Sequence, residues 1–218
     1  MPTSMTFDSL TSDLQTYLER GTPSDTEVAN QIPRLINLAE RAIATKLKVQ
    51  GFLNVVIANL VAGTSVYQKP DRWRQTVSMN IGTGANQNVR QVLLPRSYDY
   101  CRTYWPDSSV MDTTQPPLFY ADYDYNNWLV VPTPPINYPW EINYYQLPAL
   151  LDSTNQTNWL TNYAPNLLLY RALLEMTPFL KNDERIPTWQ AMYQEQLADL
   201  DLQDLQKVVD RDAVRSKA

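Results

Sequence analysis

The chain has 218 residues, 44% hydrophobic and 19% charged, a balance that excludes disorder and favours one domain or one core with a satellite subdomain. Its formal net charge of -5 and the lack of a basic block exclude the electrostatic footprint of a protein that grips phosphates. Histidine is absent and Cys101 is the only cysteine, which excludes a Ser-His-Asp triad, a thiolate metal cluster and a disulfide within the chain.

Residues 1–51 are predicted to form the N-terminal helices. The first helix is expected to start near Asp8, with Thr6 or Asp8 as its cap. The second helix contains Pro33, which predicts either a kink or a later start of the true helix. Apolar residues recur at helical spacing in both segments, so each helix is expected to pack one face onto a core.

Residues 52–151 are predicted to be β-rich, because most of the 16 prolines lie there and β-branched and aromatic residues become frequent. The polar residues 82–88 read as an exposed hairpin loop, and a short helix is predicted over residues 96–105. Asn126 and Asn127 predict a second, tight hairpin turn, since asparagine tolerates positive φ. The predicted strands are residues 53–60, 76–81, 89–93, 118–125, 128–131 and 140–145.

Residues 152–209 are predicted to be helical again, including a final long helix from about Pro187 to beyond Val209. The charged residues 210–218 are predicted to be a flexible tail that orders on a partner. The predicted fold class is α+β: a helical bundle formed by both chain ends with an inserted small antiparallel β-sheet.

Motifs that carry catalysis are missing, so the chain is predicted to be no enzyme and to hold no cofactor or metal. A phosphate-binding loop is absent, and Gly82 with Gly84 gives only G-x-G without the third glycine. Asp122 and Asp124 would share one face of a strand, which fits acid–base work, a weak site for a hard cation or simply a solvated sheet face. The segment 69–74 mixes basic residues with a tryptophan, which fits either stacking on a base or sugar or a surface ion pair.

Membrane and export signals are also missing from the sequence. No apolar run reaches the roughly 18 residues of a membrane span, so no membrane partner is expected. The first residues lack the basic and apolar regions of a secretory signal, so folding is expected in a reducing cytoplasm.

Several runs of sequence resemble a known protein family when they are taken in order. The runs are QIPRLINLAER (31–41), KPDRW (69–73), LPRSYDYC (94–101), WLVVPTP (128–134), YYQLP (144–148) and APNLLLY (164–170) leading to KNDER (181–185). Together they resemble the head-to-tail adaptor, or connector, proteins of tailed double-stranded DNA phages. The resemblance covers most of the chain, and it depends on the order and spacing of the runs.

The resemblance implies a structural virion protein with a helical part and a β-rich part and no catalytic residues. Such adaptors form a dodecameric ring below the portal, extend the DNA channel and dock the tail. The implied partners are the portal protein, tail or nozzle proteins and further copies of the chain, while DNA passes without specific binding. The implied location is the neck between head and tail, assembled in the host cytoplasm.

Two groups of residues are the candidate contact sites. In many such adaptors a C-terminal helix or tail packs against the portal, so the portal-binding candidates are Leu205, Val208, Val209, Arg211, Val214 and Arg215. Polar tips flanked by aromatic strands fit contacts with the tail or a neighbouring subunit. These candidates are Gly82, Gly84, Asn86, Asn88, Tyr123, Tyr125, Asn126 and Asn127.

Two other functions compete with the adaptor reading. Tyrosine, tryptophan and aspartate in the β-rich region also fit a carbohydrate-binding or carbohydrate-degrading tail component. A helical scaffold or regulator that forms no ring is the second alternative, and its mass in solution would distinguish it from an adaptor.

Overall fold

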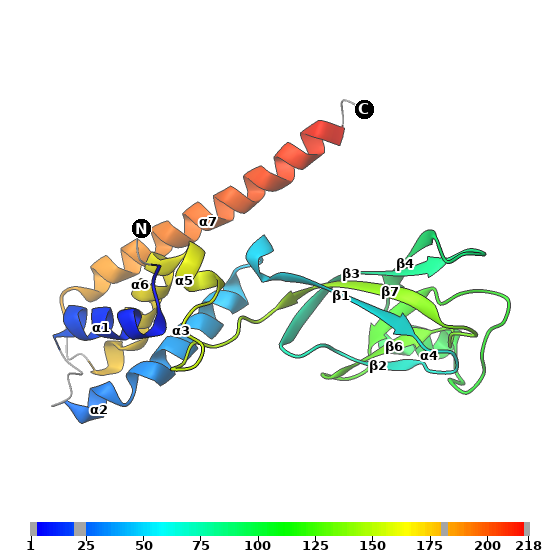
Figure 1. The fold of residues 1–218 in the computed structure, drawn as a ribbon, viewed down its shortest axis with the longest axis horizontal. Helices are drawn as coiled ribbons and strands as arrows, with labels where there is room; N and C mark the ends of the chain where they lie inside the picture. Colours follow the sequence, from blue (N-terminus) through cyan, green and yellow to red (C-terminus); the bar gives the residue numbers. More distant parts are fainter. Residues whose placement is uncertain (1–3, 20–24, 180–182, 216–218) are drawn as a thin grey trace. The chain divides into compact units, whose positions relative to one another are not determined.

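A computed structural model describes residues 4–19, 25–179 and 183–215 of the chain, with side chains as far as residue 202. It divides into two compact units (Figure 1). The helical unit is built from Met1–Phe52 and Leu147–Ala218, and the β unit is Leu53–Gln146. The chain therefore leaves the helical unit at Phe52 and re-enters it at Leu147.

Helices from both ends of the chain form the helical unit. Their bounds are α1 Phe7–Leu18, α2 Thr26–Ala29, α3 Ile32–Lys46, the 3₁₀ turn η1 Gln50–Phe52, α5 Trp159–Tyr163, α6 Pro165–Glu175, the 3₁₀ turn η2 Thr177–Phe179 and α7 Ile186–Arg215. Helix α6 contacts α1, α3 and α7, and its buried side chains include Leu168 and Ala172.

Local sequence signals set where these helices begin. Thr6 is the N-cap of α1, and its hydroxyl accepts a hydrogen bond from the Ser9 N–H. Pro33 lies in the first turn of α3, where the missing N–H costs nothing, so the later start is the correct alternative and the helix has no proline inside it. Pro165 opens α6 in the same way.

The β unit is one seven-stranded sheet with the strand order β1-β7-β3-β4-β5-β6-β2. The β4–β5 pairing is parallel and the other pairings are antiparallel. The elements are β1 Leu53–Leu60, β2 Val66–Gln68, β3 Trp73–Thr83, β4 Val89–Pro95, α4 Tyr98–Tyr104, β5 Phe119–Asp122, β6 Asn127–Val131 and β7 Tyr138–Gln146.

Aromatic side chains fill the inside of this sheet. Trp128 is fully buried, and its ring centroid lies 5.7 Å from that of Trp140 and 6.1 Å from that of Trp73. Tyr67 of the edge strand β2 packs edge-to-face on Trp140 of β7, with centroids 5.2 Å apart. These contacts reach from β2 at one end of the strand order to β7 next to the other end, so the sheet is curled around its core.

The predicted fold class is wrong. The protein is a mixed α/β protein with a seven-stranded curled sheet, not a helical bundle with a small inserted sheet. Two signals misled the prediction. Strand β3 starts already at Trp73, but irregularities between Trp73 and Gln75 and between Thr76 and Ser78 break its alternation. Strand β2 has only three residues, too few for a pattern.

Candidate interaction surfaces

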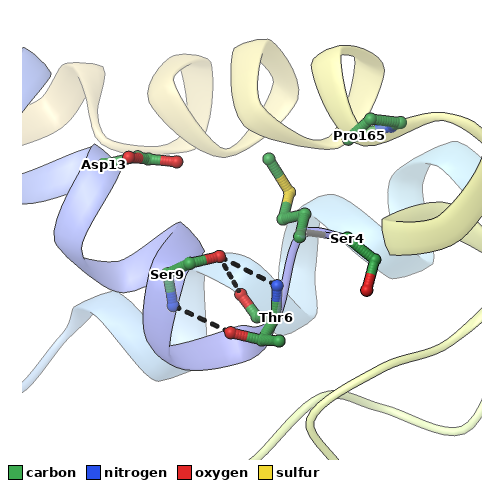
Figure 2. Close-up of a pocket in the computed structure, with 6 residues that line it drawn as sticks. Ser4, Thr6, Ser9, Asp13 and Pro165 are labelled. Carbon is green, nitrogen blue, oxygen red and sulfur yellow. Dashed lines mark hydrogen bonds between the residues drawn. The ribbon is translucent and has the colours of Figure 1, made fainter. Parts of the chain in front are cut away.

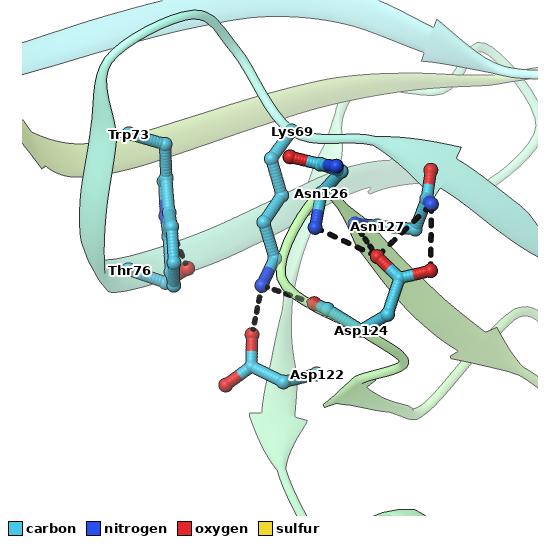
Figure 3. A network of polar contacts seen from close by, with 7 residues as sticks. All are labelled: Lys69, Trp73, Thr76, Asp122, Asp124, Asn126 and Asn127. Atoms are coloured by element: carbon cyan, nitrogen blue, oxygen red, sulfur yellow. Dashed lines mark hydrogen bonds and ion pairs between the residues drawn. The ribbon is translucent and has the colours of Figure 1, made fainter.

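The β5–β6 hairpin presents tyrosines at its tip. Tyr123 is 42% exposed and Tyr125 is 78% exposed. The Asp124 Oδ1 atom accepts hydrogen bonds from the N–H groups of Asn126 at 2.7 Å and Asn127 at 2.8 Å (Figure 3). Hydrogen bonds from the Asn127 side chain and from these N–H groups hold the pKa of Asp124 below its usual value. The turn is therefore tied internally by Asp124, while Tyr125 stays free for contact.

A buried lysine contacts the β5–β6 hairpin. Lys69 is 7% exposed, and its Nζ atom lies 2.7 Å from Asp122 Oδ1 and donates to the Asp124 carbonyl oxygen at 2.9 Å (Figure 3). The same ammonium lies 3.9 Å from the Trp73 ring centroid. Asp122 thus forms an ion pair with Lys69, and the Asp124 side chain accepts hydrogen bonds within its own turn. In the described part of the chain, no group of three acidic or cysteine side chains could hold a metal ion.

Helix α4 adds a second aromatic surface beside the hairpin. The ring centroid of Tyr98 on α4 lies 5.8 Å from that of Tyr123. The Arg102 guanidinium lies 5.5 Å from the Tyr98 ring and 5.9 Å from the Tyr123 ring, and so joins the two elements. We call Tyr98, Tyr100, Tyr104, Arg96, Arg102 and the hairpin tip the α4–hairpin surface.

Sequence reasoning missed the α4 side of this surface. Tyr98, Tyr100 and Tyr104 are 41%, 45% and 37% exposed. The Arg96 guanidinium lies 5.5 Å from the Tyr100 ring, and Tyr100 stacks with Tyr104 at 6.4 Å. A signal was present, because Tyr100 with Tyr104 and Tyr98 with Arg102 have the i, i+4 spacing that puts side chains together on a helix.

The predicted loop at residues 82–88 joins β3 to β4, and its contacts differ from those of the hairpin. Gly82 is the last but one residue of β3 and is buried, and a Cβ atom there would lie 2.5 Å from the Gln87 carbonyl oxygen. Gly84 has φ +85, while Asn86 and Asn88 are exposed. The Gln87 side chain donates to the Asn137 carbonyl oxygen at 2.7 Å. Tyr123, Tyr125, Asn126 and Asn127 are grouped at the other tip.

The portal-binding candidates all lie in the last part of α7. This helix continues through Arg215, so it includes part of the segment predicted as a tail. The side chains of Leu205, Val208, Val209, Arg211, Val214 and Arg215 are outside the described residues.

A hollow of about 750 Å³ lies at the start of α1. Its lining residues are Ser4, Met5, Thr6, Ser9, Asp13 and Pro165 (Figure 2). Thr6 and Ser9 bond to each other through N–H···O contacts of 2.8 and 3.1 Å, so their polar atoms cap α1. Among the described residues that line the hollow, Asp13 is the one titratable side chain, so these residues offer no acid–base pair.

Burial raises the pKa of the Cys101 thiol above its usual value, against the opposing charges of Arg96 and Arg102. No helix in the described ranges is long and apolar enough to cross a membrane.

A buried carboxyl holds the returning chain in the helical unit. Glu40 of α3 is fully buried, and its Oε2 atom accepts a hydrogen bond from the Leu151 N–H at 3.0 Å. Its Oε1 atom accepts another from the Asn158 side chain. Burial raises the pKa of Glu40 to about 7, although both hydrogen bonds favour the carboxylate.

Replacing Glu40 with glutamine is expected to flatten the pH dependence of stability. The pKa of Glu40 in the folded protein lies above its ordinary value of 4.5, so the folded protein holds this proton more tightly than the unfolded chain does. The resulting stabilisation is complete below pH 4.5 and is lost as pH rises to about 7, a change of up to about 3 kcal/mol. Urea unfolding between pH 4 and about 8 measures this slope.

Glu40→Leu is the matched control, because it removes the charge and both hydrogen-bond acceptors. Glu40→Leu is also expected to flatten the pH dependence of stability. Its free energy of unfolding should be lower than that of Glu40→Gln at every pH. Equal slopes for the wild type and Glu40→Gln would contradict the assignment.

The family model described as SU10 adaptor protein matches residues 5–216, which span both units of the structure. A search of the curated proteins gave no match.

Proposed function

Since the chain belongs to the SU10 adaptor protein family, a family of structural phage proteins, we propose that it forms a ring below the portal that extends the DNA channel and docks the tail. As a member of this family it is a virion component that interacts with other head or tail proteins. The ring, the portal contact and the neck location are the proposal.

The main structural support is the stretch of α7 from Tyr193 to Leu202. Trp189 and Tyr193 are buried in the helical unit, but no described side chain of α7 after Tyr193 is buried. Leu202 is 57% exposed. A partner that covered the stretch between Tyr193 and Leu202, where no described side chain is buried, would stabilise this 30-residue helix. The portal is the proposed partner, bound through the end of α7 from Leu205 to Arg215.

The α4–hairpin surface is the proposed contact with the tail or a neighbouring subunit. Tyrosine and arginine dominate interface hot spots, because they bring large, stiff surfaces with polar ends. Here tyrosine rings and two guanidinium groups are already held together, so little side-chain entropy remains to be lost on binding. The loop after β3 is the second proposed contact, through the exposed residues Gly84, Asn86 and Asn88, while Gly82 is buried in β3 beneath it.

The acidic balance of the chain suits a channel component. A ring of subunits with net charge -5 repels passing phosphates, so DNA can move without specific binding. Loading of the chain onto purified portal rings tests the proposal directly.

Replacing Tyr123 and Tyr125 with serine tests the tail-side contact. The double variant is expected to load onto portal rings normally and to weaken either ring closure or tail attachment by at least about tenfold. Native mass measurements on portal complexes with and without tail protein separate these steps. Tyr163→Ser, a 70% exposed tyrosine of the helical unit, is the matched control and should change neither step. Normal closure and attachment in the double variant would contradict the contact.

A carbohydrate-binding tail component is the second candidate, because the α4–hairpin surface gathers exposed tyrosines beside aspartates. Its rings, however, contact one another edge-to-face at the Tyr98–Tyr123 pair and do not line a described pocket. A screen against soluble glycans decides between the candidates.

A further inference from the structure

The two edges of the sheet are protected very differently. The edge strand β2 has three residues and is followed at once by Lys69 and Pro70, a charge and a proline that discourage pairing. The edge strand β1 has eight residues, LNVVIANL, without a charge or a proline. A long, regular and apolar edge without protection is a template for another strand.

The side chains on β1 support the same conclusion. Val56 and Ala58 pack against the core, so the alternate residues point to the outer face of the sheet. On that face, Leu53 is 36%, Val55 is 50% and Ile57 is 77% exposed. These side chains form an apolar row beside the open edge.

The backbone groups on the open edge can be assigned from the pairing along the sheet. The backbone N–H of Leu94 in β4 donates to the Leu118 carbonyl oxygen on the β5 side. Backbone N–H and C=O groups point to opposite sides in successive residues of a strand, so those of Leu93 face β3. When the same alternation is followed along the paired residues of β3, β7 and β1, the backbone groups of Val56 and Ala58 face β7. It leaves Val55, Ile57 and Asn59 facing the edge.

Two observations agree with this assignment. The Val55 N–H donates to the Asn54 side chain at 2.9 Å, and the Val61 N–H donates to the Tyr67 hydroxyl at 3.0 Å. Both N–H groups therefore point away from β7. Between them, the N–H groups of Ile57 and Asn59 lie on the same open edge.

We propose that β1 receives an extended, uncharged strand from the neighbouring tail protein. The strand pairs with the edge-facing groups of Ile57 and Asn59 and covers the apolar row on the outer face. This inference rests on the proposed function, because the neck of the virion supplies the neighbouring protein.

The charges near β1 define the chemistry of the incoming strand. Glu141, the outer-face neighbour of Ile57 on β7, already lies 3.3 Å from Arg90. Because Glu141 is already paired and the outer face of β1 is an apolar row, this face favours an uncharged strand with alternating apolar residues.

A second copy of the chain fits β1 less well. No other long unpaired strand occurs among the described residues, so a second copy would have to offer its own β1. Pairing β1 with β1 creates a twofold contact that stops at two subunits, whereas a ring needs contacts between different surfaces.

The first experiment places a charge on the edge. Ile57→Lys should leave folding and portal loading unchanged but weaken binding of the tail protein to the loaded portal by at least about tenfold. Val110→Lys, which changes a 50% exposed valine outside the sheet, is the matched control and should bind normally. Normal tail binding by Ile57→Lys would overturn the proposal, and so would a dimer of free wild-type chain that Ile57→Lys disrupts.

The second experiment follows amide hydrogen exchange in the full chain. In the free protein, the Ile57 and Asn59 amides should exchange quickly and those of Val56 and Ala58 slowly. In the complete portal complex with tail protein, the first pair should become slow. Fast exchange there would overturn strand addition even if Ile57→Lys weakened binding. Wild-type chain that fails to load onto portals would refute the proposed function, but exchange with tail protein alone would still test the edge.

Discussion

A chain that ends at Val209 is expected to lose stable docking on portal rings, with an affinity at least about a hundredfold lower. The missing segment contains three of the proposed contact residues, Arg211, Val214 and Arg215, and the last turns of α7. Between Tyr193 and Leu202 no described side chain of the remaining helix is buried, so this stretch is not held by the core of the chain itself.

The shortened chain should fold as well as the complete one. The Arg171 guanidinium and the Lys46 ammonium each lie 5.6 Å from the Tyr193 ring, and Trp189 is also buried on α7. All of these anchors precede the cut. An unchanged urea midpoint with lost docking would therefore assign the effect to the contact. Normal docking of the chain ending at Val209 would contradict the proposed role of α7.

Lys69→Ala is expected to lower the free energy of unfolding of the β unit by about 3 kcal/mol. The change removes a buried stem, the ammonium above the Trp73 ring and the hydrogen bond to the Asp124 carbonyl. Asp122 is 65% exposed in its side chain and stays hydrated, so no unpaired charge is buried. Tryptophan fluorescence in urea reports the loss, since Trp73 and Trp128 adjoin the lysine.

Two variants separate the contributions of Lys69. Lys69→Met keeps the apolar stem and should cost about half as much. Arg90→Ala removes an ion pair of the same unit whose side chains are 60% and 34% exposed, and should cost at most about 0.5 kcal/mol. If Lys69→Ala costs no more than Arg90→Ala, the buried lysine does not hold the hairpin.

The sequence predicted the parts of the fold that depend on local signals. Capping and proline rules predicted the short helix α4, and they left two alternatives each for the cap of α1 and for Pro33, of which the structure has Thr6 and the later start. The long final helix was also predicted, and α7 begins at Ile186. The sheet depends on pairing between distant strands. Its size and its parallel β4–β5 contact could not be read from single strands.

The same difference applies to the candidate surfaces. Polar tips can be found in a sequence, and Tyr125 is indeed highly exposed. The burial of Lys69 could not be predicted, because a lysine followed by proline and aspartate normally indicates a solvated turn. Its partners come from residues about fifty positions away, at Asp122 and Asp124. The open edge of β1 required the strand order, which no local pattern contains.

The mass of the complex formed when the purified chain is mixed with portal rings tests the central proposal most directly. An adaptor should load to one chain per portal subunit, while the chain alone stays small or forms rings of the same symmetry. Masses that show neither association with the portal nor self-association would contradict the proposed function and favour the glycan-binding alternative.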